Sequence, residues 1–331
     1  MTSVDVVMPV RNGAAFIAES LDSILAQTLP PARIIVSDDG STDATAEIVK
    51  SYTARDPRVE FLPSAGHGVS SARNRGIIRS TAEFIAFCDA DDLWMPDKLE
   101  KQMAVFAAGS RKIGAVHCNY THINDDGSPR PQDIPVPPKK RGNICLDMLF
   151  HQYVLSGSAS AAVVRRSALD EAGYFDERLF LGEDADVWIR IAEKYEWDFS
   201  PDTLVAIRVH NASAQRRVDR QRDWKYLFQR LILLDKWYGK VDFPAPILPE
   251  LRQDVARICL RRFFAPTVVV RLYRQLKSSD LKLARDLFPD FRAYGLTLLP
   301  LAASAVVGRI KHLIFKVLLS HDYQRTLRRP R

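Results

Sequence analysis

Apolar and polar positions in the first two thirds of the chain alternate between short apolar runs and amphipathic stretches. The runs expected to form strands are Val4–Met8, Arg33–Ser37, Val59–Leu62, Phe84–Cys88, Ala115–Thr121, Ala161–Val164 and Leu204–Val209. Between them, apolar and small residues recur at helical spacing at Phe16, Ser20 and Ile24, which predicts a helix there. Further helices are expected over 44–52, 96–108 and 184–194. This alternation predicts an α/β fold, with β-α units that build a mostly parallel sheet flanked by helices.

Carboxylates follow two of these predicted strands. Asp38 and Asp39 come after the second strand, where Ser41 or Thr42 is placed to cap the following helix, and Asp89 comes after the fourth. Ligands of open α/β sheets bind beyond the carboxyl ends of the strands. We therefore expect the carboxylates after both strands to share one crevice.

The strand pattern stops near residue 215. Helical patterns follow over Trp224–Tyr238, Glu250–Phe264 and Val268–Leu276. We therefore expect an α/β domain over 1–215 and an α-helical C-terminal region over 216–331.

Composition and charge add information on partners. The 331 residues are 47% hydrophobic and 26% charged, which is typical of a folded chain, and the net charge of +7 concentrates in the last third. The segment 296–319 mixes apolar and basic residues, so it is expected either to lie on an anionic membrane surface or to pack on the rest of the protein. The uncharged run 293–308 is shorter than the ~20 residues of a spanning helix. No nucleic-acid partner is expected.

Four scattered cysteines, at positions 88, 118, 145 and 259, form neither a C-x-x-C site nor a dense disulfide framework. The N-terminus has no basic and apolar signal regions and enters an apolar strand at once. Both features predict a cytoplasmic location, and the basic C-terminal region extends this expectation to a peripheral position on the inner face of the cell membrane.

The densest group of candidate ligands is Asp89-Ala-Asp91-Asp92. Carboxylates this close repel one another without a cation, and Mg²⁺ or Mn²⁺ commonly binds through one or two carboxylates together with substrate phosphates. The alternative is an Asp-rich turn with a helix cap at Asp92 or Asp97.

Two further segments suit a nucleotide. Asp38-Asp-Gly-Ser-Thr-Asp43 offers acceptors for a base imide or ribose hydroxyl, although the same residues also form turns. The stretch 66–76 opens a helix with glycines and carries Arg73, a bidentate phosphate donor. Its spacing matches neither a P-loop nor a dinucleotide fold.

A carboxylate pair, Glu183-Asp184, begins the amphipathic helix at 184–194. It either serves as a general base beside a crevice or interacts with the helix dipole. His210, just past the last predicted strand, is a candidate metal ligand or a structural residue.

Five motifs together resemble glycosyltransferase family 2 in their order and spacing. They are Val6-Val-Met-Pro9-Val-Arg-Asn12, Asp38-Asp-Gly-Ser-Thr-Asp43, Ala72-Arg-Asn-Arg-Gly76, Asp89-Ala-Asp91-Asp92 and Gly182-Glu-Asp-Ala-Asp186, and the resemblance covers roughly residues 3 to 215. The resemblance implies a GT-A fold, which is a Rossmann-like mixed sheet flanked by helices. It further implies a nucleoside diphosphate sugar donor, a divalent metal (Mn²⁺ or Mg²⁺) and inversion at the anomeric carbon.

Residue roles carried over by this resemblance concern first the donor. The positions expected to bind the nucleotide sugar are Pro9, Val10, Asp38, Asp39, Arg73, Asn74, Asp89 and Glu183. The sequence departs from many members at Arg11, where they have an aromatic residue. The base pocket is therefore expected to differ in detail.

The remaining roles concern the metal and the reaction. The resemblance implies that Asp89, Asp91 and His210 hold the cation and that Asp184 is the catalytic base. It implies transfer to a hydroxyl of a saccharide or lipid-linked acceptor, in synthesis of a cell-surface polysaccharide or glycan. Transfer of a single sugar is expected, because the chain lacks the Q-x-x-R-W pattern and paired membrane helices of processive synthases.

Two alternatives stay open. A sugar nucleotidyltransferase also uses carboxylates and a metal, but Pro9-Val-Arg-Asn-Gly13 is a poor match to its glycine-rich basic loop. A non-catalytic nucleotide-sugar binding protein would keep the fold without the reaction, which the intact Asp91 and Asp184 disfavour.

Overall fold

The computed structural model describes residues 3–133, 137–150, 158–179, 182–210, 224–243, 247, 249–251 and 281–283. Contacts divide the chain into two compact units, Met1–Arg217 and Val218–Arg331. The boundary expected near residue 215 falls within 211–223, outside the described residues, and stays a prediction.

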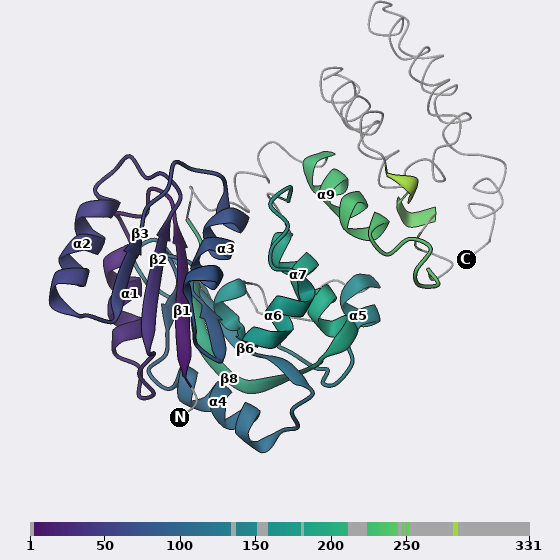
Figure 1. Ribbon diagram of the computed structural model, residues 1–331, viewed down its shortest axis with the longest axis horizontal. Coiled ribbons are helices and arrows are strands. Elements are labelled where there is room, and N and C mark those ends of the chain that lie inside the picture. The colour runs from purple at the N-terminus through teal and green to yellow at the C-terminus, as the bar shows by residue number, and fades with distance from the viewer. Residues whose placement is uncertain are drawn as a thin grey trace, which may run out of the picture. The chain divides into compact units, whose positions relative to one another are not determined.

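Eight strands of the described chain form one mixed sheet in the order β3-β2-β1-β4-β7-β6-β8-β5 (Figure 1). The strands are β1 Val4–Val10, β2 Arg33–Asp38, β3 Val59–Leu62, β4 Phe84–Phe87, β5 Leu93–Trp94, β6 Ile113–Ile123, β7 Val163–Arg165 and β8 Glu196–Arg208. Strands β1 to β4 run parallel, β7 runs antiparallel to β4 and β6, and β8 runs parallel to β6. The carboxyl ends of β1, β2, β4, β6 and β8 therefore meet at one edge of the sheet.

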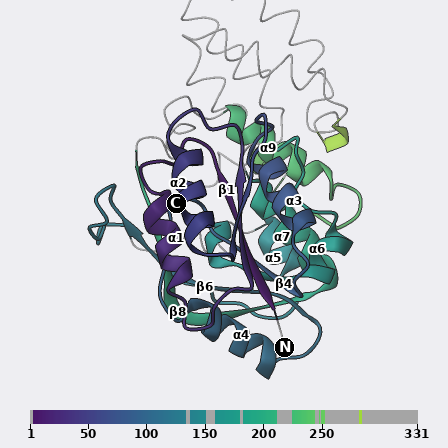
Figure 2. The same ribbon diagram turned by 60° about the vertical axis from the view of Figure 1, so that its left-hand side comes forward.

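Helices cover both faces of the sheet. They are α1 Ile17–Leu25, α2 Thr45–Arg55, α3 Val69–Arg79, α4 Lys98–Ala108, α5 Cys145–Phe150, α6 Arg166–Ala172 and α7 Glu183–Lys194, with a 3₁₀ turn at Ala159–Ala161. Figures 1 and 2 show α1 and α2 on one face and α3, α6 and α7 on the other. This two-layer cover is what a sheet with apolar side chains on both faces requires.

Alternate residues of β1 pack against the two helical layers. Met8 belongs to the same apolar core as Ile17 and Leu21 of α1. On the other face, Val7 meets α3 at Gly76, where a Cβ would come only 2.4 Å from Val7 Cγ1. The glycine therefore lets α3 approach the sheet closely, which fixes the position of the residues that precede it on this helix.

Most predicted elements are confirmed, but several bounds and one cap differ. Strand β8 begins at Glu196, well before the predicted start at Leu204, and the short edge strand β5 and helix α5 were not predicted. The proposed cap of α2 was wrong, because the residue before this helix is Ala44 and the hydroxyls of Ser41 and Thr42 point elsewhere. Asp43 instead accepts the Thr45 amide of the first turn.

In the second unit the described residues include helix α9, Trp224–Asp235. Leu231, Leu234 and Trp237 are buried, and the Asp235 carboxylate accepts the Leu283 amide at 2.6 Å. Most of the predicted helices over 250–264 and 268–276, and the whole segment 296–319, lie outside the described residues. No helix within the described ranges combines the length and apolar character needed to cross a membrane.

Candidate active site

The first two strand ends place the predicted nucleotide-binding residues together. Pro9 and Val10 end β1, and Val10 pairs with Asp38, the last residue of β2. Strand β1 lies between β2 and β4, so Asp38 and Asp89 flank it at the same edge, about 10 Å apart at the usual strand spacing. The expected shared crevice therefore agrees with the strand order.

The loops after β1 and β2 interlock through Asn12. This residue has φ 54°, and its Oδ1 accepts the Thr42 amide at 2.8 Å while its own amide donates to Ser41 Oγ at 2.9 Å. Asparagine tolerates this left-handed conformation better than most residues. Asp43 adds a bond from the Ala14 amide; its burial raises the carboxyl pKa, but its hydrogen bonds outweigh this and lower the pKa overall.

Asp38 and Asp39 are buried and already hydrogen-bonded. Asp38 accepts the Ser41 amide at 3.1 Å, and Asp39 accepts the amides of His67 and Gly68 at 2.6 and 3.0 Å. The bonds to Asp39 hold the loop that opens α3. The turn role considered from the sequence is thus present, and recognition of the base by these carboxylates stays a prediction.

Arg73 connects two other elements of the site. Its guanidinium donates to Asp89 Oδ1 at 2.8 Å and to Glu183 Oε1 at 2.7 Å, and only 4% of its side chain is exposed. A buried guanidinium thereby ties the end of β4 to the start of α7. Two carboxylates beside it keep the arginine charged in spite of its burial, and its pKa is raised above the ordinary value.

Asn74, next along α3, has a bracing role. Its side-chain nitrogen donates to the Phe175 carbonyl at 2.9 Å, and its oxygen accepts the Phe175 amide at 2.9 Å. The side-chain amide therefore mimics a strand partner for the loop before α7. Contact of Asn74 with a donor stays a prediction.

The aspartate turn, residues 89–92, follows β4. The Ser160 hydroxyl accepts the Asp89 amide at 2.9 Å and donates to Asp92 Oδ2 at 2.6 Å. Burial, and next the negative charges of Asp91 and Asp89, raise the pKa of the Asp92 carboxyl well above its ordinary value. Asp92 therefore braces the turn from inside, while Asp89 and Asp91 keep about a third of their side chains exposed, 31% and 32%.

Arg208, the last residue of β8, also holds this turn, and the sequence analysis missed it. Its Nε donates to the Asp91 carbonyl at 3.0 Å, its amide donates to Asp92 Oδ1 at 3.1 Å, and its guanidinium pairs with Glu19 at 2.6 Å. Only 1% of its side chain is exposed. The available signal was a charged residue at the end of an otherwise apolar strand pattern.

His210 lies two residues further on. Its Nε2 is 2.8 Å from Asp91 Oδ2, and its ring lies 4.9 Å from the Phe16 ring, centroid to centroid. The structure thus brings together two of the three predicted metal ligands, while the carboxylate of the third, Asp89, binds Arg73 and Ser158. Across the described ranges, no three His, Cys, Asp or Glu side chains are gathered closely enough to form a metal site.

Asp184 lies in the first turn of α7, whose preceding residue, Gly182, has φ 72°. Burial raises the pKa of this carboxyl to about 6, the charge of Glu183 adds to the rise, and Arg73 opposes it. The Ala185 amide donates to Asp184 Oδ1 at 2.7 Å. A carboxylate with this pKa is mostly ionised at neutral pH yet more basic than an ordinary aspartate, as a general base requires.

Two solved structures with a similar fold contain a bound nucleotide sugar. S. aureus TarS in complex with UDP-GlcNAc aligns with a TM-score of 0.60 and 17% identity over 88% of this chain and 80% of that chain. The mannosyltransferase PcManGT of Pyrobaculum calidifontis, in complex with GDP-Man and Mn²⁺, aligns with a TM-score of 0.53 and 22% identity over 92% and 86%. The predicted GT-A fold is therefore confirmed.

Sequence comparisons agree with the fold. An uncharacterized glycosyltransferase of Rickettsia typhi is 30% identical over 63% of this chain and 64% of its own length, so the match spans less than two thirds of that relative. Bacillus subtilis TuaG, named provisionally as a teichuronic acid biosynthesis glycosyltransferase, is 33% identical over 40% of this chain and 53% of its own. The family profile for glycosyl transferase family 2 matches residues 5–173, about half of the chain. The chain belongs to glycosyl transferase family 2.

Proposed function

We propose that this protein is an inverting glycosyltransferase that moves one sugar from a nucleoside diphosphate donor to a hydroxyl of a saccharide or lipid-linked acceptor. The observation that carries the proposal is the connected set of charged side chains at the carboxyl edge of the sheet. It runs from Asp89 through Arg73 to Glu183, with Asp184 next in the chain. This arrangement supports the proposal, because one set of ion pairs joins the first turn of α7, which carries the base candidate, to the strand end that we expect to face the donor.

Asp184 is the proposed general base. A carboxyl with a pKa of about 6 accepts a proton more readily than an ordinary aspartate, and the bond from the Ala185 amide to Oδ1 leaves Oδ2 for the acceptor hydroxyl. The hydroxyl oxygen attacks the anomeric carbon as its proton passes to Asp184, and the bond from that carbon to the diphosphate oxygen breaks. A single displacement of this kind inverts the anomeric centre.

Arg73 and Glu183 keep this base in position. The ion pair between Glu183 and Arg73 fixes the first turn of α7, and the ion pair between Arg73 and Asp89 connects that turn to the end of β4. A misplacement of about 1 Å can cost ~100-fold in rate. We therefore assign Arg73 a positioning role in addition to the donor contact expected from the resemblance.

We propose that the aspartate turn and His210 bind a divalent cation. Asp91 and Asp89 offer partly exposed carboxylate oxygens, and His210 offers a ring nitrogen beside Asp91, which is an oxygen-rich set that suits Mn²⁺ or Mg²⁺. Such an ion, when bound, neutralises negative charge on the leaving diphosphate. PcManGT, with the same fold, was solved with Mn²⁺ and GDP-Man, which supports this donor and metal class.

The proposal also covers the acceptor and the location. TuaG is named for the synthesis of a cell-wall polysaccharide, teichuronic acid, which supports a role in cell-surface polysaccharide or glycan synthesis. For a lipid-linked acceptor we propose a peripheral position on the inner face of the cell membrane, through the basic region at the C-terminal end. Sedimentation with anionic vesicles, with and without residues 290–331, tests this: equal binding of both forms contradicts it.

Metal-dependent hydrolysis of a panel of nucleotide sugars tests the activity. We expect one donor to be hydrolysed with Mn²⁺ and not with chelator, and Asp184→Asn to lower the rate by about 10²–10⁴-fold. Glu47→Gln is the matched control, because Glu47 also lies in the first turn of a helix, but its side chain is exposed and bonds to none of the proposed site residues. Hydrolysis that is equal in Asp184→Asn and Glu47→Gln would remove Asp184 from the mechanism.

A further inference from the structure

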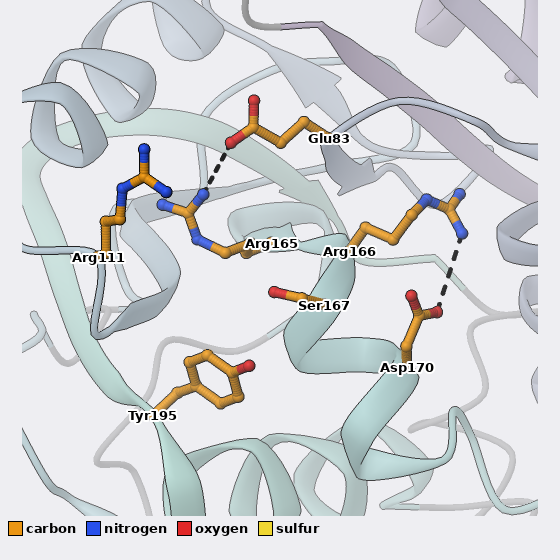
Figure 3. Close-up of a pocket in the computed structure, with 7 residues that line it drawn as sticks. All are labelled: Glu83, Arg111, Arg165, Arg166, Ser167, Asp170 and Tyr195. Carbon is orange, nitrogen blue, oxygen red and sulfur yellow. Dashed lines mark hydrogen bonds and ion pairs between the residues drawn. The ribbon is translucent and has the colours of Figure 1, made fainter.

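A feature outside the candidate active site lies at the sheet edge opposite to the aspartate turn. There a pocket of about 450 Å³ is lined by residues just before β4, β6 and β8, by the end of β7 and by α6 (Figure 3). Strand β7 runs antiparallel to its neighbours, so its carboxyl end lies at their amino ends. The four residues of β4 separate the pocket from the aspartate turn by roughly 13 Å.

Positive charge exceeds negative charge in this pocket. Arg111, Arg165 and Arg166 line it together with only two carboxylates, those of Glu83 and Asp170. Arg165 pairs with Glu83 at 2.8 Å, and Arg166 lies 3.9 Å from Asp170. Arg111 is exposed and makes no ion pair or hydrogen bond with the residues that the structure describes.

Two of the three guanidiniums are held rigidly. Arg166 donates to the carbonyls of Ala82 and Ser80 at 2.9 and 2.6 Å. The Arg165 guanidinium lies 4.7 Å from the Phe84 ring centroid, and 18% of its side chain is exposed. Arg111 and Arg165 both line the pocket (Figure 3). One fixed and one unpaired guanidinium thus face the same space.

We propose that this pocket binds a phosphate group, with Arg111 and Arg165 as its main ligands. Guanidinium groups bind phosphate oxygens through paired N–H donors, and an anion between two arginines relieves their mutual repulsion. The volume exceeds that of a single phosphate and falls in the range of small-molecule sites, so the ligand is a phosphate carried on a small organic group. The site is separate from the proposed donor site and does not depend on its chemistry.

Binding of inorganic phosphate, followed by calorimetry in the presence of EDTA, tests the proposal on the full chain. We expect Arg111→Gln to weaken binding at least tenfold and Lys112→Gln to leave it unchanged. Arg111 and Lys112 are both exposed, and each substitution removes one positive charge, but only Arg111 lines the pocket. Equal affinity in wild type and Arg111→Gln overturns the proposal, as does equal weakening in both variants.

The phosphate could come from a soluble metabolite or from a lipid headgroup, and a second arm separates these sources. Vesicles of phosphatidylcholine with and without phosphatidic acid are sedimented with wild type, Arg111→Gln and Lys112→Gln. Sedimentation that needs both phosphatidic acid and Arg111 assigns the site to a lipid phosphate. Arg111-dependent binding of inorganic phosphate alone assigns it to a soluble ligand, and no dependence on Arg111 in either arm refutes the site.

Discussion

Replacing Arg73 by methionine tests how the proposed base is held. Methionine keeps much of the side-chain length but removes the charge that Asp89 and Glu183 share. Breaking a buried ion pair on one side costs about 3–5 kcal/mol, because the partner charges stay behind. Asp89 is 31% exposed and water can solvate it again, so we expect the lower end, about 3 kcal/mol.

This loss has two measurable consequences. For a unit the size of Met1–Arg217, a cost of about 3 kcal/mol lowers the midpoint of thermal unfolding by roughly 6–12 °C. Arg73 also lowers the pKa of Asp184, against the effects of burial and of Glu183. Without that charge the pKa rises further, so the acid limb of the pH–activity profile moves to higher pH.

The control is Arg79→Met on the same helix. Arg79 pairs with Glu60, but 54% of its side chain is exposed, so its pair contributes at most about 1 kcal/mol. Circular dichroism melts and pH profiles of donor hydrolysis compare the two variants. This prediction is refuted if Arg73→Met unfolds at the same temperature as Arg79→Met and its pH–activity profile keeps the wild-type acid limb. The connection from Asp89 to Glu183 would then not position the base.

Three further predictions follow from other contacts. Because the folded state raises the pKa of Asp184 from 3.8 to about 6, its stability falls as pH rises between these values. Asp184→Asn should therefore have a higher free energy of unfolding than wild type at pH 8, by up to ~3 kcal/mol, which a higher midpoint in urea denaturation would show. The difference should vanish below pH 4. Gly76→Ala should cost about 2 kcal/mol or more, because the new methyl group meets Val7; an unchanged urea midpoint would show that α3 can shift freely. His210→Ala should weaken Mn²⁺ binding about tenfold or more in a titration followed by electron paramagnetic resonance, and unchanged affinity would leave Asp91 without its proposed partner.

Local sequence patterns were sufficient for the parts of the site that depend on neighbouring residues. The apolar run of β4 with an aspartate directly after it predicted where Asp89 lies, because a strand end is set by local composition. The start of α7 was equally visible, because its acidic first turn precedes an apolar stripe. These features need no knowledge of the partners across the sheet.

The bracing residues could not be predicted in this way. Ser160 reaches Asp92 across 68 positions of sequence, and Arg208 reaches the same carboxylate across 116. Serine and arginine are common surface residues, so neither type signals burial by itself. The edge strand β5 was missed for a related reason, because two residues carry no periodicity and the strand exists only by pairing with β8.

The contacts of Arg208 also bear on how the protein becomes active during synthesis. This arginine bonds to the aspartate turn and, 189 positions away, to Glu19, so its support of the turn forms only after nearly the whole first unit has been translated. Sheets that pair distant segments assemble late, since loop closure must precede the contacts. A nascent chain that ends before β8 would hold the turn through Ser160 but would lack the bonds from Arg208. Competence to bind a donor is therefore expected to arise in the last step of folding of this unit.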